Sequence, residues 1–542
     1  MMRRIHRSVV RAGVAGAALL ALTQAGPASA LATSRDRPVQ AVADSYGTRG
    51  TGTLAVTAKS GLLANDQGRD PQLVAHSDPA NGTVTVAPDG SFTYVPQAGF
   101  TGDDTFTYTT TGAARLYPTG LPPLGNIGGI AMTGGAYGSS LFPVPGSKDE
   151  FWGLTDRGPN VDLPDGGKGE PLPSFTPALG RFRLRDGRAV LQKVVPLRDG
   201  QGHPYSGLVD NANPTGETIE DLNGHKLTTD PNGYDPEGLA VLRDGTFWIS
   251  DEYGPFITHF DSRGRALQRL SPVDGTLPAE LIKRIPNKGM EGLTVTPDGR
   301  TLVGIMQSAL QQTDLGAANA KNLTPLRIVT YDLKTHAEHE YVYLLDDPKT
   351  TGTAVSEITA LSSTTFLVDE RNGDFVGATG YKKLFKIDTS KATDVGPHAT
   401  VAGAVYDASK GGLTVGGKSI ELLLNGKDTA GSASALTAAG ITPVAKTLGL
   451  DVNAFLVGLD PKARFFSHDK IEGVAAVDGG KKIVISNDSD FGVDGVTGTA
   501  PPYALHPKVS PATGRQDDGE FLVIDTTGPA ATTTATVTIH VG

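Results

Sequence analysis

The stretch Asp235–Gly254 reads DPEGLAVLRDGTFWISDEYG. Two runs of apolar and β-branched residues flank the polar turn Arg243-Asp244-Gly245, a combination typical of a β-hairpin. Acidic residues stand at both ends of the hairpin, with Glu237 at the start of the first run and Asp251-Glu252 after the second. Because the two ends of an antiparallel hairpin lie at the same edge, these carboxylates are expected to face a common space.

The same order of acid, apolar run, turn, apolar run and charged residue recurs further along the chain. The glutamates at the start of the first runs are Glu237, Glu291, Glu357 and Glu472, separated by 54, 66 and 115 residues. The charged residues after the second runs are Asp156, Arg157, Asp251, Glu252, Asp369, Glu370, Arg371 and Asp488. The copy that ends at Asp156-Arg157 is weaker, since it lacks the glutamate.

Self-similar units of a few short strands predict an all-β fold, specifically a β-propeller. About 400 residues at ~40–50 per blade, after some of the length is allowed for inserts, would give roughly six or seven blades. The gap of 115 residues is about twice the others, which indicates either a disguised blade or a long insert. Residues 430–457 have a helical pattern and are the candidate insert.

Convergence of the repeated hairpins would place the carboxylates at one mouth of the propeller channel. So many acids repel one another unless a cation compensates, and oxygen ligands favour Ca²⁺, with Mg²⁺ as the alternative. We expect Glu237, Glu291, Glu357, Glu472, Arg157 and Arg371 to act in catalysis. We expect Asp156, Asp251, Glu252, Asp369, Glu370 and Asp488 to hold the metal. The competing interpretation is that these are ordinary solvated residues at strand ends.

Residues 40–112 form a second unit with short alternating runs around the turn Asp89-Gly90, which predicts a small β-sandwich. Nothing after Tyr108 supplies a final threonine-rich strand, whereas the chain ends TATVTIHV at residues 534–541. We therefore expect the large unit, residues 118–527, to be inserted before the last strand of the small one, which residues 532–542 would complete. A solvated C-terminal tail is the alternative.

Composition limits the function. Residues 1–30 have the basic start, apolar centre and Ala28-Ser29-Ala30 end of a secretory signal peptide. The chain has 48 Lys and Arg against 58 Asp and Glu, and removing four leader arginines leaves 44 against 58. This acidic balance argues against nucleic acid as a partner. The absence of cysteine excludes thiol chemistry and Cys-based metal sites. No later segment reaches the roughly 18 apolar residues of a membrane span. The mature protein is expected to be exported, with association with the cell wall left open.

Several motifs resemble known families. Asp235-Pro236-Glu237-Gly238-Leu239, Gly289-Met290-Glu291-Gly292-Leu293 and Ile471-Glu472-Gly473-Val474, with Gly153–Asn160 and Ser486–Gly492, resemble the phytase-like family, often described as having esterase-like activity of phytase. The resemblance implies a β-propeller and hydrolysis of phosphate or other esters. Residues 62–66, 81–84, 89–94 and 104–108 resemble the bacterial Ig-like, cadherin-like modules of exported proteins.

The residues are compatible with three functions. The first is a metal-dependent phosphoesterase, in which Arg157, Arg371 and Lys288 neutralise the phosphoryl group. The second is a metal-dependent carboxylesterase or lactonase, with His468 or His259 as base; no G-x-S-x-G elbow of an α/β-hydrolase occurs. The third is a non-catalytic, calcium-stabilised binding propeller. The substrate is in each catalytic case a small-molecule ester.

Residues 411–419, GGLTVGGKS, satisfy the spacing of a phosphate-binding loop. The surrounding sequence lacks the strand-and-helix alternation that such a loop requires, so we expect an ordinary loop there.

Overall fold

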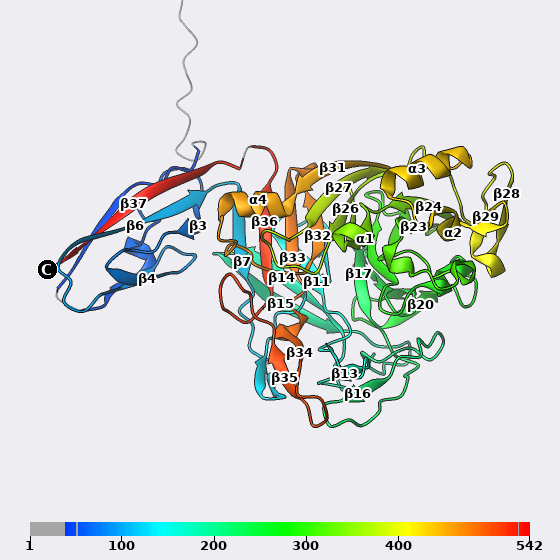
Figure 1. Cartoon of the computed structure of the whole chain (residues 1–542), viewed down its shortest axis with the longest axis horizontal. Helices are drawn as coiled ribbons and strands as arrows, with labels where there is room; N and C mark the ends of the chain where they lie inside the picture. The colour runs from blue at the N-terminus through cyan, green and yellow to red at the C-terminus, as the bar shows by residue number, and fades with distance from the viewer. Residues whose placement is uncertain (1–37, 50–51, 529) are drawn as a thin grey trace, which may run out of the picture.

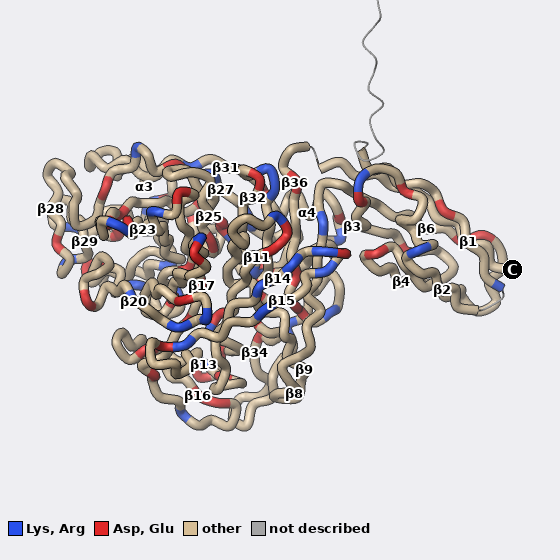
Figure 2. The backbone as a smooth tube through the Cα atoms, turned by 180° about the vertical axis from the view of Figure 1, so that it is seen from behind, with Lys and Arg blue, Asp and Glu red and all other residues tan. Residues whose placement is uncertain are grey.

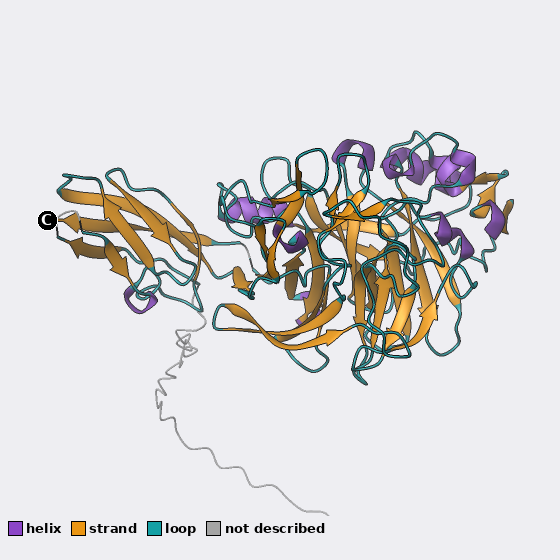
Figure 3. Ribbon diagram, turned by 90° about the horizontal axis from the view of Figure 1, so that it is seen from below, coloured by secondary structure: helices purple, strands orange, loops and turns teal. Residues whose placement is uncertain are grey.

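The computed structural model describes residues 38–49, 52–528 and 530–542, so the predicted signal peptide lies outside the described residues. Figure 1 shows a small elongated module beside a much larger one. Strands dominate both modules, and the helices lie at the edge of the larger one (Figure 3). Acidic and basic residues are interspersed along the chain rather than gathered in one basic face (Figure 2).

The small module is a sandwich of two sheets. One sheet has the order β1 (Asp44–Thr48), β37 (Thr532–Val541), β6 (Gly102–Thr111), β3 (Gln72–His76), and the other β2 (Leu54–Val56), β5 (Phe92–Pro96), β4 (Gly82–Val86). The C-terminal strand β37 lies inside its sheet, parallel to β1 and antiparallel to β6. Its residues Val537 and Ile539 are fully buried in the sandwich core. The end of the chain is therefore a central strand of the small module and no solvated tail.

The large module contains five four-stranded sheets, each antiparallel. In order from the inner strand outward, they are β10 (Ser140–Pro143), β11 (Glu150–Leu154), β14 (Ala178–Arg185), β15 (Arg188–Pro196); β17 (Pro236–Val241), β18 (Phe247–Asp251), β19 (Ile257–Phe260), β20 (Ala266–Leu270); β21 (Met290–Val295), β22 (Thr301–Met306), β23 (Pro325–Asp332), β24 (Glu338–Leu344); β25 (Ala354–Ala360), β26 (Thr365–Arg371), β27 (Lys382–Asp388), β31 (Ala445–Asp451); and β32 (Ile471–Val477), β33 (Lys482–Asn487), β36 (Glu520–Asp525), β7 (Ala114–Pro118).

The inner strands of these sheets contact one another in the cyclic order β10, β17, β21, β25, β32 and back to β10. Every residue of β17 and β21 is buried, which explains why these strands are continuous apolar runs rather than alternating ones. Strand β7 follows directly after the sandwich and forms the outer strand of the last sheet, so the large module starts at Ala114 rather than at residue 118.

The expected number of six or seven blades is not what the described residues form, since they form five four-stranded sheets. The estimated number of blades was too high because too much of the large module's length was assigned to blades and too little to inserts. The 115-residue gap arises from residues 389–444, which are inserted between β27 and β31 of one sheet.

This insert contains the small sheet β28 (Ala404–Asp407), β29 (Gly412–Val415), β30 (Lys418–Ser419) and the helices α2 (Ile420–Leu424) and α3 (Thr429–Ala438). The remaining helices are α1 (Pro348–Thr351) and α4 (Val452–Leu459). The expectation of helix throughout 430–457 was therefore wrong in its middle, where β31 completes a sheet.

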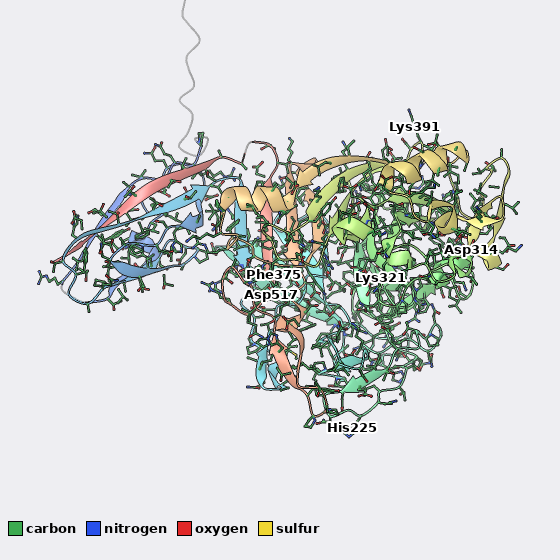
Figure 4. All side chains as sticks on the ribbon, viewed as in Figure 1. His225, Asp314, Lys321, Phe375, Lys391 and Asp517 are labelled. Atoms are coloured by element: carbon green, nitrogen blue, oxygen red, sulfur yellow. The ribbon has the colours of Figure 1, made fainter. Side chains whose placement is uncertain are left out.

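Shorter strands extend below the five sheets in Figure 1. They are β12 (Val161–Asp162), β13 (Lys168–Glu170) and β16 (Ile219–Asp221), the hairpin β34 (Val493–Thr497) and β35 (Ala504–Pro507), and the hairpin β8 (Gly125–Ile127) and β9 (Ile130–Met132). His225, labelled in Figure 4, lies at the tip of this extension.

Candidate active site in the axial cavity

A cavity of about 300 Å³ lies at the ends of the inner strands, and we call it the axial cavity. All five sheets contribute to its lining, and Val161, Asp162, Val493 and Asp494 of the extension complete its wall. The extension thus stands over one mouth of the ring of sheets, and the lining is strongly polar.

Each sheet places one side chain in the axial cavity from the end of its second strand. These residues are Asp156, Glu252, Gln307, Arg371 and Asp488. In four of the sheets the equivalence follows from the strand pairing, because the cavity residue comes directly after the residue that pairs with the start of the inner strand or its neighbour. Asp156 comes two residues after Leu154, which pairs with Ser140 at the start of β10. The repeat in the sequence is therefore a repeat of positions around one cavity.

The acids one position earlier do not line the cavity, because successive side chains on a strand face opposite ways. Asp251 instead accepts hydrogen bonds from the backbone N–H of Tyr253 (2.9 Å) and Asp235 (3.2 Å). Glu370 accepts a hydrogen bond from the hydroxyl of Tyr343 (2.5 Å) and is ion-paired with Lys446. Both acids hold loops in place, which does not fit the metal-binding role expected for them.

Glu237, Glu291 and Glu472 line the axial cavity for a different local reason. The register between the first two strands shifts at each of them, so that each glutamate is the extra residue of a β-bulge without a cross-strand partner. A bulge re-aims its side chain away from the ladder. All three side chains are buried.

The sequence repeat predicts that Glu357 is equivalent to these glutamates. The pairing of β25 with β26 shows that the equivalent residue lies one position earlier. In its sheet the bulge residue is Ser356, and Glu357 pairs with Asp369 as Gly238 pairs with Ser250. Its carboxylate accepts hydrogen bonds from the hydroxyl of Ser140 and from its neighbour's N–H at Ile358 (2.9 Å). Backbone N–H groups of Leu141 and Leu293, from two other inner strands, also bond to it. Glu357 ties inner strands together and does not line the axial cavity.

Two other expected site residues lie behind the cavity wall. Arg157 is buried, donates to the Asn160 side chain (3.0 Å) and lies 4.9 Å from the ring centre of Tyr253. Asp369 is buried beside Arg371, and burial raises its pKa well above the ordinary value. Neither residue is part of the lining.

Asp156, Asp235 and Glu237 form the tightest group of acids in the cavity. One carboxylate oxygen of each lies within 4.8 Å of those of the other two, and all three residues are buried. Burial raises the pKa of all three, and repulsion by Asp488 on Asp156 and by Asp235 on Glu237 adds to it. A cation held between them would offset both the burial of their negative charges and the repulsion among them.

Glu252 and Glu291 form a second pair of cavity acids. Burial, followed by repulsion from Asp235, raises the pKa of Glu252 to about 7. Burial and repulsion from Glu252 raise the pKa of Glu291 well above its ordinary value. Glu252 Oε1 and Glu291 Oε2 are buried and have no hydrogen-bond partner within the described part of the chain. A carboxyl group with a pKa near 7 is suited to exchanging protons at neutral pH.

The basic residues of the cavity are engaged with neighbours. Arg371 donates to Glu472 and to the hydroxyl of Ser356 (2.9 Å). Lys470 Nζ lies 3.1 Å from Asp488 Oδ2 and 2.5 Å from Asp490 Oδ1.

Asp235, Lys470 and Asp490 are cavity residues that the sequence analysis did not assign to the site. Asp235 opens the hairpin quoted above, two residues before Glu237, and Lys470 holds the matching place before Glu472. Their position in the repeat was therefore a usable signal.

The two histidines considered as bases lie outside the axial cavity. His468 is buried between Asp517 (2.6 Å) and Glu520 (3.2 Å); although burial opposes its charged form, these carboxylates raise its pKa to about 10. Asp517 is labelled in Figure 4. His259 stacks on Trp248 with 4.4 Å between ring centres.

The stretch 411–419 is no phosphate-binding loop. The Ser419 hydroxyl donates to Asp314 (2.7 Å), whose carboxylate would repel a phosphate, and the helix that follows has one turn.

Comparison with known proteins agrees with the motifs. The profile of the family described as phytase-like, "esterase-like activity of phytase", matches residues 134–491. The chain belongs to this family. Residues 35–116 match the bacterial cadherin-like domain, which confirms the resemblance of the small module.

A protein of the fungus Arthroderma benhamiae, described as an uncharacterized secreted protein, is 32% identical over 185 residues. The match covers 27% of this chain and 36% of that protein, so the chain spans about a third of the relative's length. Within the described residues no helix combines the length and the apolar character needed to cross a bilayer.

The chain is also similar, at low sequence identity, to solved structures. A luciferin-regenerating enzyme gives a TM-score of 0.29 at 9% identity, over 88% of this chain and 96% of its own. Virginiamycin B lyase from Staphylococcus aureus gives 0.25 at 10% identity, over 90% and 94%. TM-scores this low say nothing about the chemistry of the axial cavity.

Proposed function

We propose that the protein is an exported, metal-dependent ester hydrolase that acts in the axial cavity. The observation that carries the proposal is the group Asp156, Asp235 and Glu237, three buried carboxylates within 4.8 Å of one another in a cavity of a phytase-like protein. Membership of the family supports hydrolysis of esters, and the geometry supports the metal.

The residues present fit a hard divalent cation such as Ca²⁺ or Mg²⁺. Such ions take carboxylate oxygens and complete their shell with water or substrate oxygens. Asp156 accepts one backbone N–H at Oδ1, from Gly158 (2.9 Å), which leaves its second oxygen for a cation. Asp235 accepts the Arg157 backbone N–H at Oδ1 (3.1 Å), and its Oδ2 lies 3.7 Å from Arg157 Nε, too far for a hydrogen bond. When bound, the ion would polarise the ester oxygen and lower the pKa of water.

The chain's own residues would manage the proton. Attack by water forms a bond from its oxygen to the ester carbon or phosphorus and breaks the bond to the alcohol oxygen. Glu252, beside Glu291, would accept the proton from the water, and the leaving alcohol oxygen would take a proton from this acid pair. The products are the acid and the alcohol. The glutamate pair takes one proton from the water and gives one to the alcohol, so its own protonation is unchanged, and the product acid then releases its proton to solvent.

The test uses residues 31–542 and two nitrophenyl esters, an acetate and a phosphate, each with Ca²⁺ and with excess EDTA. We expect chelator-sensitive turnover that Asp235→Asn lowers by about 100-fold or more. Glu421→Gln, a buried acid outside the cavity, is the matched control and should retain turnover.

Chelator-insensitive turnover, or equal turnover in Asp235→Asn, would contradict the metal-dependent mechanism. Calcium binding that raises the melting temperature without turnover of either ester would instead favour the non-catalytic binding propeller.

A further inference from the structure

The charge of the axial cavity bears on which esters it can take, given the proposed hydrolase function. Its acidic lining residues are Asp156, Asp162, Asp235, Glu237, Glu252, Glu291, Glu472, Asp488, Asp490 and Asp494. Its basic lining residues are Lys168, Lys288, Arg371 and Lys470. Ten acids against four bases leave an excess of six carboxyl groups, which one divalent cation does not balance.

Each of the four basic side chains that line the cavity in the described residues is already oriented by a partner. Lys168 Nζ lies 2.7 Å from Asp162 Oδ1, and Lys288 donates to the side-chain oxygen of Gln307. Arg371 is held by Glu472 and Ser356, and Lys470 by Asp488 and Asp490. Recognition of a phosphate usually requires such a group to present its donors to the ligand.

The unpartnered polar atoms that face the cavity are acceptors. Glu252 Oε1 and Glu291 Oε2 are buried at the lining, and no described residue forms a hydrogen bond with them. Burial raises the pKa of both carboxyl groups, which favours their uncharged, protonated forms. Protonation removes negative charge but supplies no positive charge, so the cavity remains unfavourable for an anion.

We infer that the axial cavity takes carboxylic esters or lactones without negative charge, either uncharged or bearing an ammonium group, and disfavours phosphate monoesters. This inference rests on the proposed function for its chemistry and on the lining charges for its selectivity. It reassigns Arg157, Arg371 and Lys288 from phosphate binding to structural pairing.

The experiment compares nitrophenyl esters that share one leaving group. The acyl parts are butyrate (uncharged), 4-trimethylammoniobutyrate (cationic) and succinate (anionic), and nitrophenyl phosphate is the fourth substrate. At low ionic strength, kcat/KM for the uncharged and cationic esters should exceed that for the anionic ester by about tenfold or more. Salt at about 300 mM should shrink the difference between cationic and anionic esters, because it screens the cavity field.

A charge reversal at the cavity rim sharpens the test. Asp162 has a side chain that is 83% exposed, so Asp162→Lys changes the field without burying a charge. It should raise kcat/KM for the anionic ester and lower that for the cationic ester by about twofold to threefold at low ionic strength. Asp78→Lys makes the same change of net charge on the sandwich and should alter neither.

Preference for the phosphate or for the succinate ester would overturn the inference and leave the hydrolase function standing. Absence of turnover for all four esters would overturn the hydrolase function, and binding then tests the selectivity separately. Calorimetry with inorganic phosphate and with tetramethylammonium, in metal-free protein and in Mg²⁺, provides that readout. Tighter binding of phosphate than of tetramethylammonium would overturn the inference; the reverse order would support it.

Discussion

Among the places where the large module buries carboxylates, the axial cavity and a group around Arg327 differ most clearly, and of these two only the axial cavity has the properties of a site. In the axial cavity, Asp156, Asp235 and Glu237 lie close together, and the Arg157 guanidinium behind them approaches Asp235 only to 3.7 Å (Nε to Oδ2). Around the guanidinium of Arg327 in β23 lie Glu280 from the 3₁₀ turn Ala279–Lys283, Glu340 from β24 and Glu421 from α2 of the insert. Nη2 of Arg327 lies 2.9 Å from Glu421 and Nε lies 3.8 Å from Glu340.

The second group, which we call the Arg327 cluster, is closed to a ligand. Its four charged residues are at most 1% exposed, and the Tyr406 hydroxyl donates to Glu280 (2.6 Å). Backbone covers it so tightly that a Cβ on Gly412 would lie 2.2 Å from Glu280 Oε1. The comparison shows that burial of acids alone does not mark a functional site. What marks the axial cavity is open volume next to acids whose charge is not balanced.

The largest effect is expected from removing the central cation of the Arg327 cluster. Arg327→Met leaves three buried carboxylates without their partner and should lower the free energy of unfolding by about 3–5 kcal/mol. Chemical denaturation measures this, and Ca²⁺ affinity measured on the folded protein should not change.

Arg183→Met, which breaks the exposed pair with Asp149, is the control and should have little effect on stability. A loss of Ca²⁺ affinity in Arg327→Met would contradict the division between the two groups.

The axial cavity should respond in the opposite way to loss of a charge. Glu237→Gln removes one carboxylate of the metal group and should weaken Ca²⁺ binding by about 100-fold, or about 2.7 kcal/mol. In EDTA at pH 8 the same variant should be more stable than the wild type, because burial and the repulsion by Asp235 disfavour the charged form.

Calorimetric titration gives the affinity and denaturation in EDTA gives the stability. The matched control is again Glu421→Gln, the same substitution at a buried acid outside the axial cavity. Lower stability of Glu237→Gln in EDTA would show that this glutamate is a structural partner rather than a ligand.

The sequence predicted the strands and the cavity acids for reasons that are local. Asp-Gly turns between apolar runs specify hairpins, and Gly245 and Gly299 indeed adopt φ values of 84° and 74°. The repeat correctly brought Glu237, Glu291, Glu472, Asp156, Glu252, Asp488 and Arg371 to one cavity.

The sequence could not fix what depends on a single-residue register. A bulge one residue earlier in the fourth sheet moves Ser356 to the glutamate position and Glu357 to the glycine position. Adjacent acids such as Asp251 and Glu252 look alike in sequence, yet strand alternation sends them to opposite sides. The number of sheets was hidden because β31 joins its sheet only after an insert of 56 residues, 389–444.

A pH titration of stability distinguishes the unbalanced acids of the cavity from balanced ones. Glu252 and Asp488 have folded-state pKa values raised to about 7, mainly by burial, above their ordinary values of 4.5 and 3.8. A raised carboxyl pKa gives stability that is fully present below the unfolded pKa and is lost as pH rises through the folded one. In EDTA, the free energy of unfolding should therefore fall by about 2–3 kcal/mol for each of these two groups between pH 5 and pH 8.

Saturating Ca²⁺ should offset most of this fall, since a cation held by Asp156, Asp235 and Glu237 stabilises the ionised forms of these neighbouring acids, so its stabilising effect should be larger at pH 8 than at pH 5. Equal stabilisation by Ca²⁺ at both pH values would mean that the metal does not bind at these carboxylates.

The smallest effect is expected at Glu357, which the sequence grouped with the cavity and the structure places between inner strands. Glu357→Gln keeps one side-chain oxygen, which can accept from two of the three N–H groups of Ile358, Leu141 and Leu293, and the Ser140 hydroxyl can accept from the new amide, so one backbone N–H loses its acceptor. The free energy of unfolding should change by only about 1 kcal/mol, and Ca²⁺ affinity should stay within about twofold of the wild type. The matched comparison is Glu237→Gln, the same substitution at a residue that lines the cavity. If Glu357→Gln weakened Ca²⁺ binding as much as Glu237→Gln, the carboxylate of Glu357 would belong to the metal group, and the register would no longer separate the two positions.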